Sequence, residues 1–415
     1  MFLSFFILAS LTSSEEQRSW QLKELLSEAL SKNLEYQEAQ KEAAKAAAHS
    51  GVARAGFFPE LGVEGGGRSN REREKRNDLF YYGYGRYNLF RGFKDLHSYF
   101  AFSSRQELAG FKEQQVKNSV AREIARHFYE LLYLNEAIRL RMADFKLSET
   151  QIEMAKKKES AGLTTKADLY EFQLHQSALE ADLSLLDQER KDKLRKLARL
   201  AGLGEVENIE VDGNLELNSE PPSLEQLLSL ATSQNESFRA AETAKRVALY
   251  EKRSAMSGWS PSVDVEAQYG KLMDTDFIES RKNSWAVVGK ITLPLFSGFS
   301  TYQEYEFSKS EFEQKELAVL RTKKDLENEV RSLFGLWKSL KQRLKIERDR
   351  KQNAKKYYEL TLSEYRRGVK NSPDLAGATD QMLESQLKEA ELLRDLQLTQ
   401  LRLAEATGQG VLWNE

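Results

Sequence analysis

The sequence has no cysteine and few histidines, and these absences exclude several kinds of chemistry. Without cysteine, the chain can form neither a disulfide framework nor a zinc site built on thiolates. The four histidines are separated by at least 30 residues, so they suggest no shared metal site. No glycine-rich phosphate loop follows a strand-like segment. We therefore expect a protein that is not an enzyme and that has no cofactor, no catalytic residues and no bound metal.

Neither sign of charge is in clear excess. The 415 residues include 62 Lys and Arg and 64 Asp and Glu, which gives a net charge of -2. Basic residues are mixed with acidic ones throughout, and even the densest basic cluster, residues 68–76, contains Glu72 and Glu74. This pattern argues against a nucleic-acid partner.

Long apolar runs are also missing, since no stretch of 18 apolar residues occurs after the N-terminal segment. Residues 2–11, FLSFFILASL, are too short to cross a bilayer as a helix but suit the hydrophobic region of a signal peptide. We expect residues 1–14 to be a signal peptide, and the alternative is a buried N-terminal segment.

The sequence contains instead a helical pattern that occurs twice. Hydrophobic residues make up 40% and charged residues 30% of the chain, and the mean hydropathy is -0.61, as is typical of long helices with narrow apolar stripes. Residues 22–33, LKELLSEALSKN, match residues 224–235, LEQLLSLATSQN. From Phe90 onward the copies match at a constant offset of 206 residues. The repeat predicts one architecture built twice.

The expected organisation follows from this alignment: a first repeat at 15–202, a linker at 203–222, a second repeat at 223–409 and a tail at 410–415. Each repeat is expected to begin with a helix of about 38 residues, which in the first copy ends near Phe57. A β-hairpin follows, and then two helices, over about 94–161 and 168–201 in the first copy. The longest helix is supported by apolar residues at every third or fourth position: Val116, Val120, Ile124, Phe128, Leu131, Leu134, Ile138, Met142 and Phe145.

The two expected hairpins, at about 59–90 and 261–296, show the alternation of β-strands. Val263, Val265, Ala267 and Tyr269 alternate with polar residues, and the return strand places Trp285, Val287 and Ile291 on one face. Such strands suit a transmembrane β-barrel, with a soluble antiparallel sheet as the alternative. Four strands cannot close a barrel, so several chains would have to contribute strands. Aromatic residues expected near the membrane interfaces are Phe90, Phe93, Trp285, Phe296 and Phe299.

Glycines mark two kinds of turn in both copies. Gly92 and Gly298 follow the hairpins, in the matching segments YNLFRGF and LPLFSGF, and are expected to let the backbone turn from strand to helix. Gly162 and Gly368 lie at the equivalent turn between the last two helices of each repeat.

This combination resembles the TolC family of bacterial outer-membrane efflux channels. The resemblance covers nearly the whole chain after the signal peptide and rests on the repeat, the PLFSGF junction, and the helix-turn segments ESAGLTTKADL (159–169) and YRRGVKNSPDL (365–375). It implies a mainly α fold with a small transmembrane β part. The duplicated unit of helix, β-hairpin, long helix and helix would form a homotrimer with a 12-stranded β-barrel continued by an α-helical barrel.

The resemblance also implies a function and partners. The protein would be the outer-membrane channel of a tripartite efflux or type I secretion system, located in the bacterial outer membrane and extending into the periplasm. Its partners would be two further copies of the chain, a periplasmic adaptor protein, an inner-membrane transporter and outer-membrane lipid.

By the same resemblance, the two helix-turn segments hold the periplasmic end shut. Tyr365 is expected to reach Asp168, and Lys370 stands where the family often has arginine. Asp374 is expected to form a ring of three carboxylates at the constriction, whereas Gly377 occupies the position of a second acidic ring that is common in the family.

Two alternatives apply. Ser372, Pro373 and Asp374 can serve as N-cap, first helical residue and dipole partner of the last helix, and Thr165 with Asp168 repeats the capping spacing. Capping alone and capping combined with gating are both consistent with these residues. For the whole chain, the alternative is a non-channel periplasmic coiled-coil scaffold or adaptor whose sheet is soluble.

Overall fold

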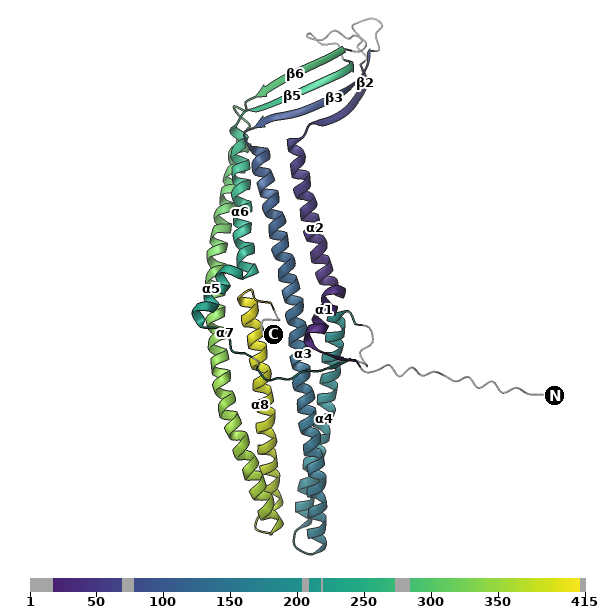
Figure 1. The fold of residues 1–415 in the computed structure, drawn as a ribbon, viewed down its shortest axis with the longest axis vertical. Helices are drawn as coiled ribbons and strands as arrows, with labels where there is room; N and C mark the ends of the chain where they lie inside the picture. Colours follow the sequence, from purple (N-terminus) through teal and green to yellow (C-terminus); the bar gives the residue numbers. More distant parts are fainter. Residues whose placement is uncertain (1–17, 69–77, 204–208, 218, 273–283, 411–415) are drawn as a thin grey trace, which may run out of the picture. The chain divides into compact units, whose positions relative to one another are not determined.

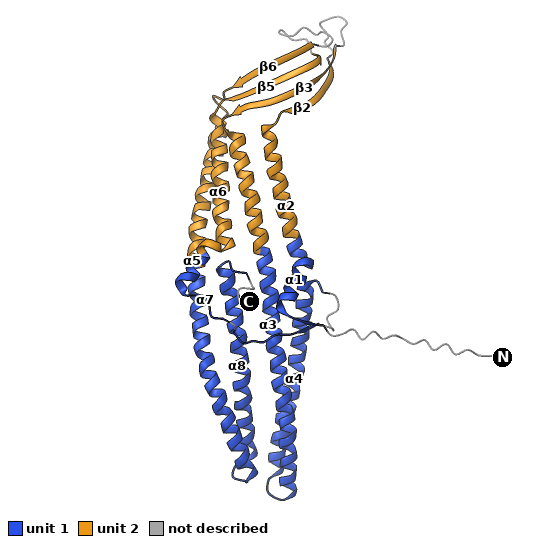
Figure 2. Cartoon of the chain, viewed as in Figure 1, with its two compact units in different colours: residues 1–37, 116–231, 327–415 blue, residues 38–115, 232–326 orange. Residues whose placement is uncertain are grey.

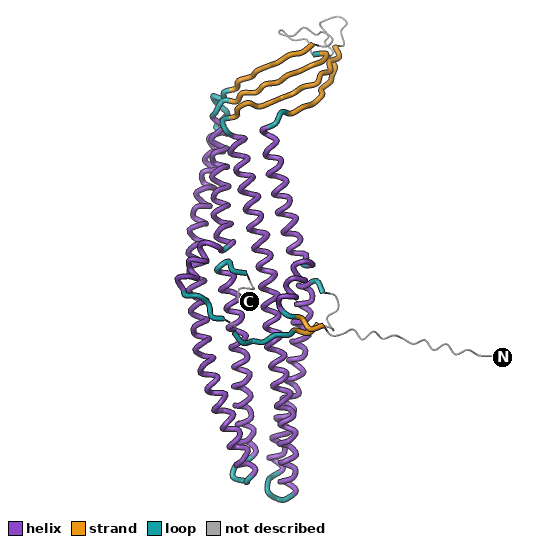
Figure 3. The backbone as a smooth tube through the Cα atoms, in the orientation of Figure 1, coloured by secondary structure: helices purple, strands orange, loops and turns teal. Residues whose placement is uncertain are grey.

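The computed structural model describes residues 18–68, 78–203, 209–217, 219–272 and 284–410. The predicted signal peptide and most of the basic cluster therefore lie outside the described residues. Helices make up most of the described chain, and the strands form two small groups (Figure 3).

The chain divides into two compact units (Figure 2). Unit 1 comprises residues 1–37, 116–231 and 327–415, and unit 2 comprises residues 38–115 and 232–326. Each unit takes residues from both sequence repeats, so the compact units do not coincide with the repeats.

The order of elements repeats along the chain (Figure 1). The two longest helices both contain 67 residues, and the helices that follow them contain 36 and 35. The elements are β1 (Arg18–Trp20), α1 (Leu22–Lys32), α2 (Leu34–Arg54), η1 (Ala55–Phe57), β2 (Glu60–Arg68), β3 (Asp78–Arg91), α3 (Lys94–Ser160), α4 (Lys166–Ala201), β4 (Ile209–Val211), α5 (Leu224–Gln234), α6 (Glu236–Met256), η3 (Ser257–Trp259), β5 (Ser262–Lys271), β6 (Ser284–Thr292), α7 (Ser300–Arg366) and α8 (Ser372–Ala406).

The first helix of each repeat is broken, so the prediction of one helix of about 38 residues was wrong. Asn33 separates α1 from α2 in an extended conformation, and its Oδ1 accepts a hydrogen bond from the Tyr36 amide at 3.0 Å. Asn235 separates α5 from α6 in the same way, with the Phe238 amide at 3.0 Å. An asparagine side chain that bonds a nearby amide competes with the helical hydrogen bond and favours an N-cap.

The long helices α3 and α7 and the shorter α4 and α8 confirm the prediction within a few residues. The apolar stripe predicted for α3 is largely buried, although Met142 is 55% exposed. Among the described residues, no helix combines the length and the apolar character needed to cross a membrane. The stripe residues in the core are Val120, Ile124, Phe128, Leu131 and Leu134.

Part of the expected linker is held firmly within unit 1. Its β4 pairs in parallel with β1, a two-stranded sheet that the sequence did not predict. Further along, Gln397 of α8 donates to the Glu216 carbonyl at 2.9 Å, and Gln400 donates to the Ser219 carbonyl at 2.8 Å. Arg348 of α7 contacts the Glu216 carboxylate at 2.9 Å. The segment after β4 is therefore tied to both α7 and α8.

Unit 2 contains one four-stranded antiparallel sheet in the order β2-β3-β5-β6, which joins the two predicted hairpins along β3 and β5 (Figure 1). Paired residues lie on the same face. Tyr269 pairs with Trp285 and Val263 with Ile291, so the predicted apolar residues do share a face. That face is uncovered within this chain: Trp285 is 74% and Ile291 75% exposed.

The opposite face of the sheet is polar and is joined across strands. The register places Glu60, Arg86 and Glu266 in one row. Side-chain hydrogen bonds link neighbouring strands, among them Tyr82 Oη to Glu64 at 2.9 Å, Arg86 Nε to Glu266 at 2.9 Å and Asn88 Nδ2 to Asp264 at 2.5 Å. The sheet thus has one apolar and one charged surface.

The strand-to-helix junction uses two successive left-handed residues in each repeat. Gly92 has φ +61° and Phe93 +65°, while Gly298 has +63° and Phe299 +67°. Left-handed phenylalanine is unfavourable, and the sequence did not predict it. Each phenylalanine packs edge-to-face against the aromatic residue three positions earlier, with ring centroids 5.3 Å apart in both copies. This aromatic pair accompanies the turn in both repeats.

The two junction glycines form a matched pair for a test of steric demand. A Cβ at Gly92 would overlap the Cβ of Ser260, whereas one at Gly298 would have no atom within 4 Å. Gly298→Ala should lower the stability by the left-handed penalty alone, about 1 kcal/mol. Gly92→Ala should lower it clearly more, as measured by thermal unfolding of the detergent-purified protein. Equal losses for the two variants would show that Ser260 yields without cost.

Candidate functional site

The ends of α3 and α7 in unit 1 are closed by the same hydrogen-bonded turn. Gly162 has φ +72°, its amide bonds the Glu159 carbonyl at 2.9 Å, and the next amide bonds the Lys158 carbonyl at 2.8 Å. Gly368 has φ +79° and repeats the arrangement with Tyr365 at 3.1 Å and Glu364 at 3.0 Å. This is the Schellman motif, which requires a left-handed residue and explains the glycine in both helix-turn segments.

Both following helices begin with a capping box. In α4 the Thr165 hydroxyl accepts from the Asp168 amide, and the Asp168 carboxylate accepts from the Thr165 amide at 3.1 Å. In α8 the partners are Asn371 and Asp374. The N-cap is therefore Asn371, and the prediction of Ser372 was wrong because only Asn371 has the three-residue spacing to Asp374. Ser372 is fully buried as the first residue of α8.

Tyr365 lies in the core where these helix ends meet. It is 2% exposed, and its ring packs edge-to-face on Phe172 of α4 with centroids 6.0 Å apart. The ammonium of Lys158 lies 3.8 Å from the ring centroid and donates to the Tyr365 carbonyl. The cluster also contains Ile152 and Ala155 of α3, Tyr358 of α7, and Leu375, Ala376 and Ala378 of α8. The helices α3, α4, α7 and α8 of unit 1 all contribute to it.

Tyr365 was expected to reach Asp168, and within this chain no hydrogen bond joins the two side chains. The Tyr365 hydroxyl has no hydrogen-bond partner among the described residues. Instead the Asp168 carboxylate accepts from the hydroxyls of Thr164 at 2.8 Å and Thr165 at 2.7 Å. These bonds and the one from the Thr165 amide all go to Oδ2 of Asp168.

Charge and burial shift several protonation equilibria here. Hydrogen bonds from Thr165, together with those from Thr164, hold the pKa of Asp168 well below its ordinary value. Burial raises the pKa of Tyr365, and the negative charge of Asp168 adds to this effect. Burial lowers the pKa of Lys158, against the opposing influence of Asp168. Lys370, by contrast, is paired at 3.7 Å with Asp374 four residues later in its own segment.

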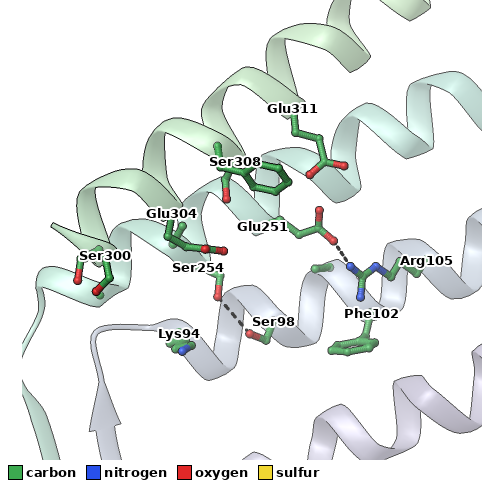
Figure 4. A pocket seen from close by; sticks show the side chains of 15 residues that line it. Lys94, Ser98, Phe102, Arg105, Glu251, Ser254, Ser300, Glu304, Ser308 and Glu311 are labelled. Carbon is green, nitrogen blue, oxygen red and sulfur yellow. Dashed lines mark hydrogen bonds and ion pairs between the residues drawn. The ribbon is translucent and has the colours of Figure 1, made fainter. Parts of the chain in front are cut away.

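Unit 2 contains a polar groove between α3, α6 and α7 (Figure 4). Small side chains line much of it, and Ser98 lies 3.3 Å from Ser254. Arg105 forms an ion pair with Glu251, whose pKa is raised by burial despite this partner. Among the described residues, no group of three or more acidic or histidine side chains has the arrangement of a metal site. The groove offers polar surface but no nucleophile paired with a base.

Comparison with known proteins identifies the family. The model of the outer membrane efflux protein family matches residues 25–203 and 227–409, most of the chain. The chain belongs to the outer membrane efflux protein family. Membership assigns it to transport rather than catalysis and places it among outer-membrane channels, in agreement with the resemblance to the TolC family. No curated protein matches the chain.

Solved structures share the fold of this family member at low sequence identity. VceC of Vibrio cholerae is 19% identical, with a TM-score of 0.82 and coverage of 94% of this chain and 96% of that one. The CmeC outer membrane channel of Campylobacter jejuni is 16% identical, with a TM-score of 0.80 and coverage of 94% and 86%. The MtrE outer membrane channel of Neisseria gonorrhoeae is 17% identical, with a TM-score of 0.77 and coverage of 94% and 89%. These similarities confirm the predicted fold class of long helices with a small β part.

Asp168 and Asp374 allow a matched test of the capping boxes. Asp168→Asn should destabilise the protein by about 1 kcal/mol at pH 7, because a neutral amide accepts the cap hydrogen bonds less strongly. Since the folded pKa of Asp168 is depressed, its stabilisation exists above the ordinary value of 3.8 and is lost as pH falls through the folded pKa. The deficit should therefore shrink below about pH 4.

The measurement is thermal unfolding of both variants at pH 7 and at pH 3.5. Asp374→Asn should cost less, because its carboxylate accepts from the Asn371 amide without the two threonine hydroxyls that Asp168 has. A deficit for Asp168→Asn that is unchanged by pH would contradict the role of its charge.

Proposed function

We propose that this chain is the outer-membrane exit duct of an efflux or type I secretion assembly. The observation that carries the proposal is the four-stranded sheet, which has an exposed apolar face, a charged face and connections to helices of 67 residues. A duct of this kind is passive, has no cofactor, and takes its energy from an inner-membrane transporter to which a periplasmic adaptor couples it.

The sheet supports a shared barrel. Among the described residues, β2 and β6 are each paired along one side only. An unpaired edge is not tolerated in the hydrocarbon region, so membrane insertion requires that these edges pair between chains. Three copies give the 12-stranded barrel of a homotrimer, with Val63, Trp285 and Ile291 toward lipid and Glu266 toward the lumen.

The aromatic residues at the strand ends fit the same arrangement. Phe90, Phe93, Phe296 and Phe299 surround the junctions, and Trp285 begins β6. Aromatic side chains favour the boundary between lipid and water. We place these five residues at the membrane interfaces and the helices on the periplasmic side.

The helix ends of unit 1 support a gate. We assign the closed contact to the packing of Tyr365 on Phe172, which joins α7 to α4, and to the pair of Lys370 with Asp374. In a trimer, three copies of Asp374 near the axis would repel one another unless they were paired, and Lys370 supplies that pairing. Asp168 supports this gate indirectly, by capping α4.

The alternative of a periplasmic scaffold with a soluble sheet accounts poorly for the exposed apolar face. Val63 is 85% exposed, and it shares that face with Trp285 and Ile291. A soluble sheet usually covers such a surface with its own core.

Adjacent residues of β6 on opposite faces test the barrel. Val287 pairs with Ala267 on the apolar face, and Val288 pairs with Glu266 on the polar face. Val287→Lys should nearly abolish the heat-resistant assembly in outer-membrane fractions, because a lysine facing lipid costs about 2–4 kcal/mol per chain near the midplane. Val288→Lys should assemble like the parent. Equal assembly of the two variants would indicate a soluble sheet.

Tyr365 provides the test of the gate. Because its hydroxyl is unpartnered and its ring is packed, Tyr365→Phe should leave the single-channel open probability in planar bilayers near that of the parent. Tyr365→Ala should raise it several-fold by removing the contact between α7 and α4. Channels in which the alanine variant opens no more often than the parent would remove Tyr365 from the gate.

A further inference from the structure

One histidine in unit 1 lies between carboxylates from two other helices. His175 of α4 places its Nε2 3.6 Å from Asp144 of α3 and its Nδ1 3.5 Å from Asp380 of α8. Each ring nitrogen thus faces a carboxylate of a different helix. A neutral imidazole has only one N–H and can donate to one of them, whereas the protonated ring can donate to both.

The buried carboxylate of Asp144 makes a neutral His175 ring unfavourable. Asp144 is 4% exposed, and neither of its carboxylate oxygens accepts a hydrogen bond from a described residue. A buried carboxylate without a compensating donor or charge is strongly destabilising. Arg141, also on α3, is 3.0 Å from Asp182 and is therefore already shared with another carboxylate.

We propose that His175 is a proton-dependent clasp that joins α4 to α3 and α8 when its ring is protonated and releases α8 when the ring is neutral. The clasp concerns contacts within one chain. Its effect on channel opening rests on the proposed function, since α4 and α8 also carry the gate contacts.

The sign of the dependence follows from the charged groups around the ring. Asp144, 3.6 Å from Nε2, raises the pKa of His175 against the effect of burial, and the charge of Asp380 adds to the increase. Arg141 opposes it. The contribution is therefore fully present at acidic pH and is lost as pH rises through the raised pKa.

The remaining neighbours of the ring set the lower limit of the pH range in which the clasp is formed. Partial burial raises the pKa of Asp380, with Glu384 of the same helix adding to the increase and His175 opposing it. On α7, burial raises the pKa of Tyr358, and the charge of Asp144 adds to the increase. Below the raised pKa of Asp380 its carboxylate becomes neutral and the contact to α8 weakens. The clasp is thus strongest between the pKa values of Asp380 and His175.

Thermal unfolding of the full chain in detergent, followed by the helical circular-dichroism signal, tests the clasp. The parent should unfold about 3 °C above His175→Gln at pH 5.5, and the difference should largely disappear at pH 8.5. The control is His49→Gln, at an exposed position of α2, which should show no difference that depends on pH. If the difference between parent and His175→Gln is the same at both pH values, the residue contributes packing alone and the proposal is overturned.

Asp380→Asn provides a second variant that preserves the buried pair, because the Asp380 side chain is 59% exposed and its replacement should not prevent folding. At pH 5.5 the parent should unfold at a higher temperature than His175→Gln, and this margin should be smaller for Asp380→Asn. An equally large margin for Asp380→Asn would overturn the contact to α8. Single-channel recordings give a separate reading: open probability should rise from pH 5.5 to 8.5 in the parent and stay high in His175→Gln. If no protein conducts, the proposed function fails while the unfolding data still decide the clasp.

Discussion

Within the described part of the chain, β2 and β6 are edge strands of the four-stranded sheet, and these edges are the constraint on which the proposed arrangement depends. In water, β2 and β6 could be hydrated at their edges, but the exposed apolar face between them favours lipid, where every backbone group needs a protein partner. In the proposed barrel the register is critical, because a slip of one residue would turn Glu266 toward lipid and Val287 toward the lumen. The cross-strand bonds of Arg86 and Asn88 oppose such a slip.

At the ends of the helices, the backbone groups find hydrogen-bond partners within the same turn. Each turn closes its own carbonyls with a Schellman motif and its own amides with a capping box, so neither helical hairpin needs the other to complete its backbone hydrogen bonds. The hairpins are joined by side-chain contacts: Tyr365 packs on Phe172, and Lys158 donates to the Tyr365 carbonyl, which also accepts from the Gly368 amide. Contacts of this kind can separate without leaving unpaired backbone groups, which is what a gate at this position requires.

Sequence reasoning predicted the features that depend on local pattern. The alternation in residues 262–270, the apolar stripe of α3 and the turn glycines each follow from spacing alone. The break at Asn33 was missed because the helical pattern continues on both sides of it, although the matching Asn235 was a usable signal. The contact of Tyr365 with Asp168 remains a prediction. Within the chain, one carboxylate oxygen of Asp168 accepts from the adjacent Thr164 and Thr165, and the sequence did not indicate this choice of partners.

Comparison of the two repeats separates the residues that build the fold from those that distinguish its halves. At the offset of 206 residues, Gly162 corresponds to Gly368 and Asp168 to Asp374, so the turn and the cap are duplicated. The cross-helix contacts are not duplicated, because Tyr365 corresponds to Glu159 and His175 to Gln381. The same local hydrogen bonds form in both copies with the same glycine and aspartate, whereas the N-cap is Thr165 in one copy and Asn371 in the other. Contacts between the hairpins involve one member from each copy, so the two copies are free to differ there. The proposed gate contact of Tyr365 and the proposed clasp of His175 therefore both lie at positions where the two repeats differ.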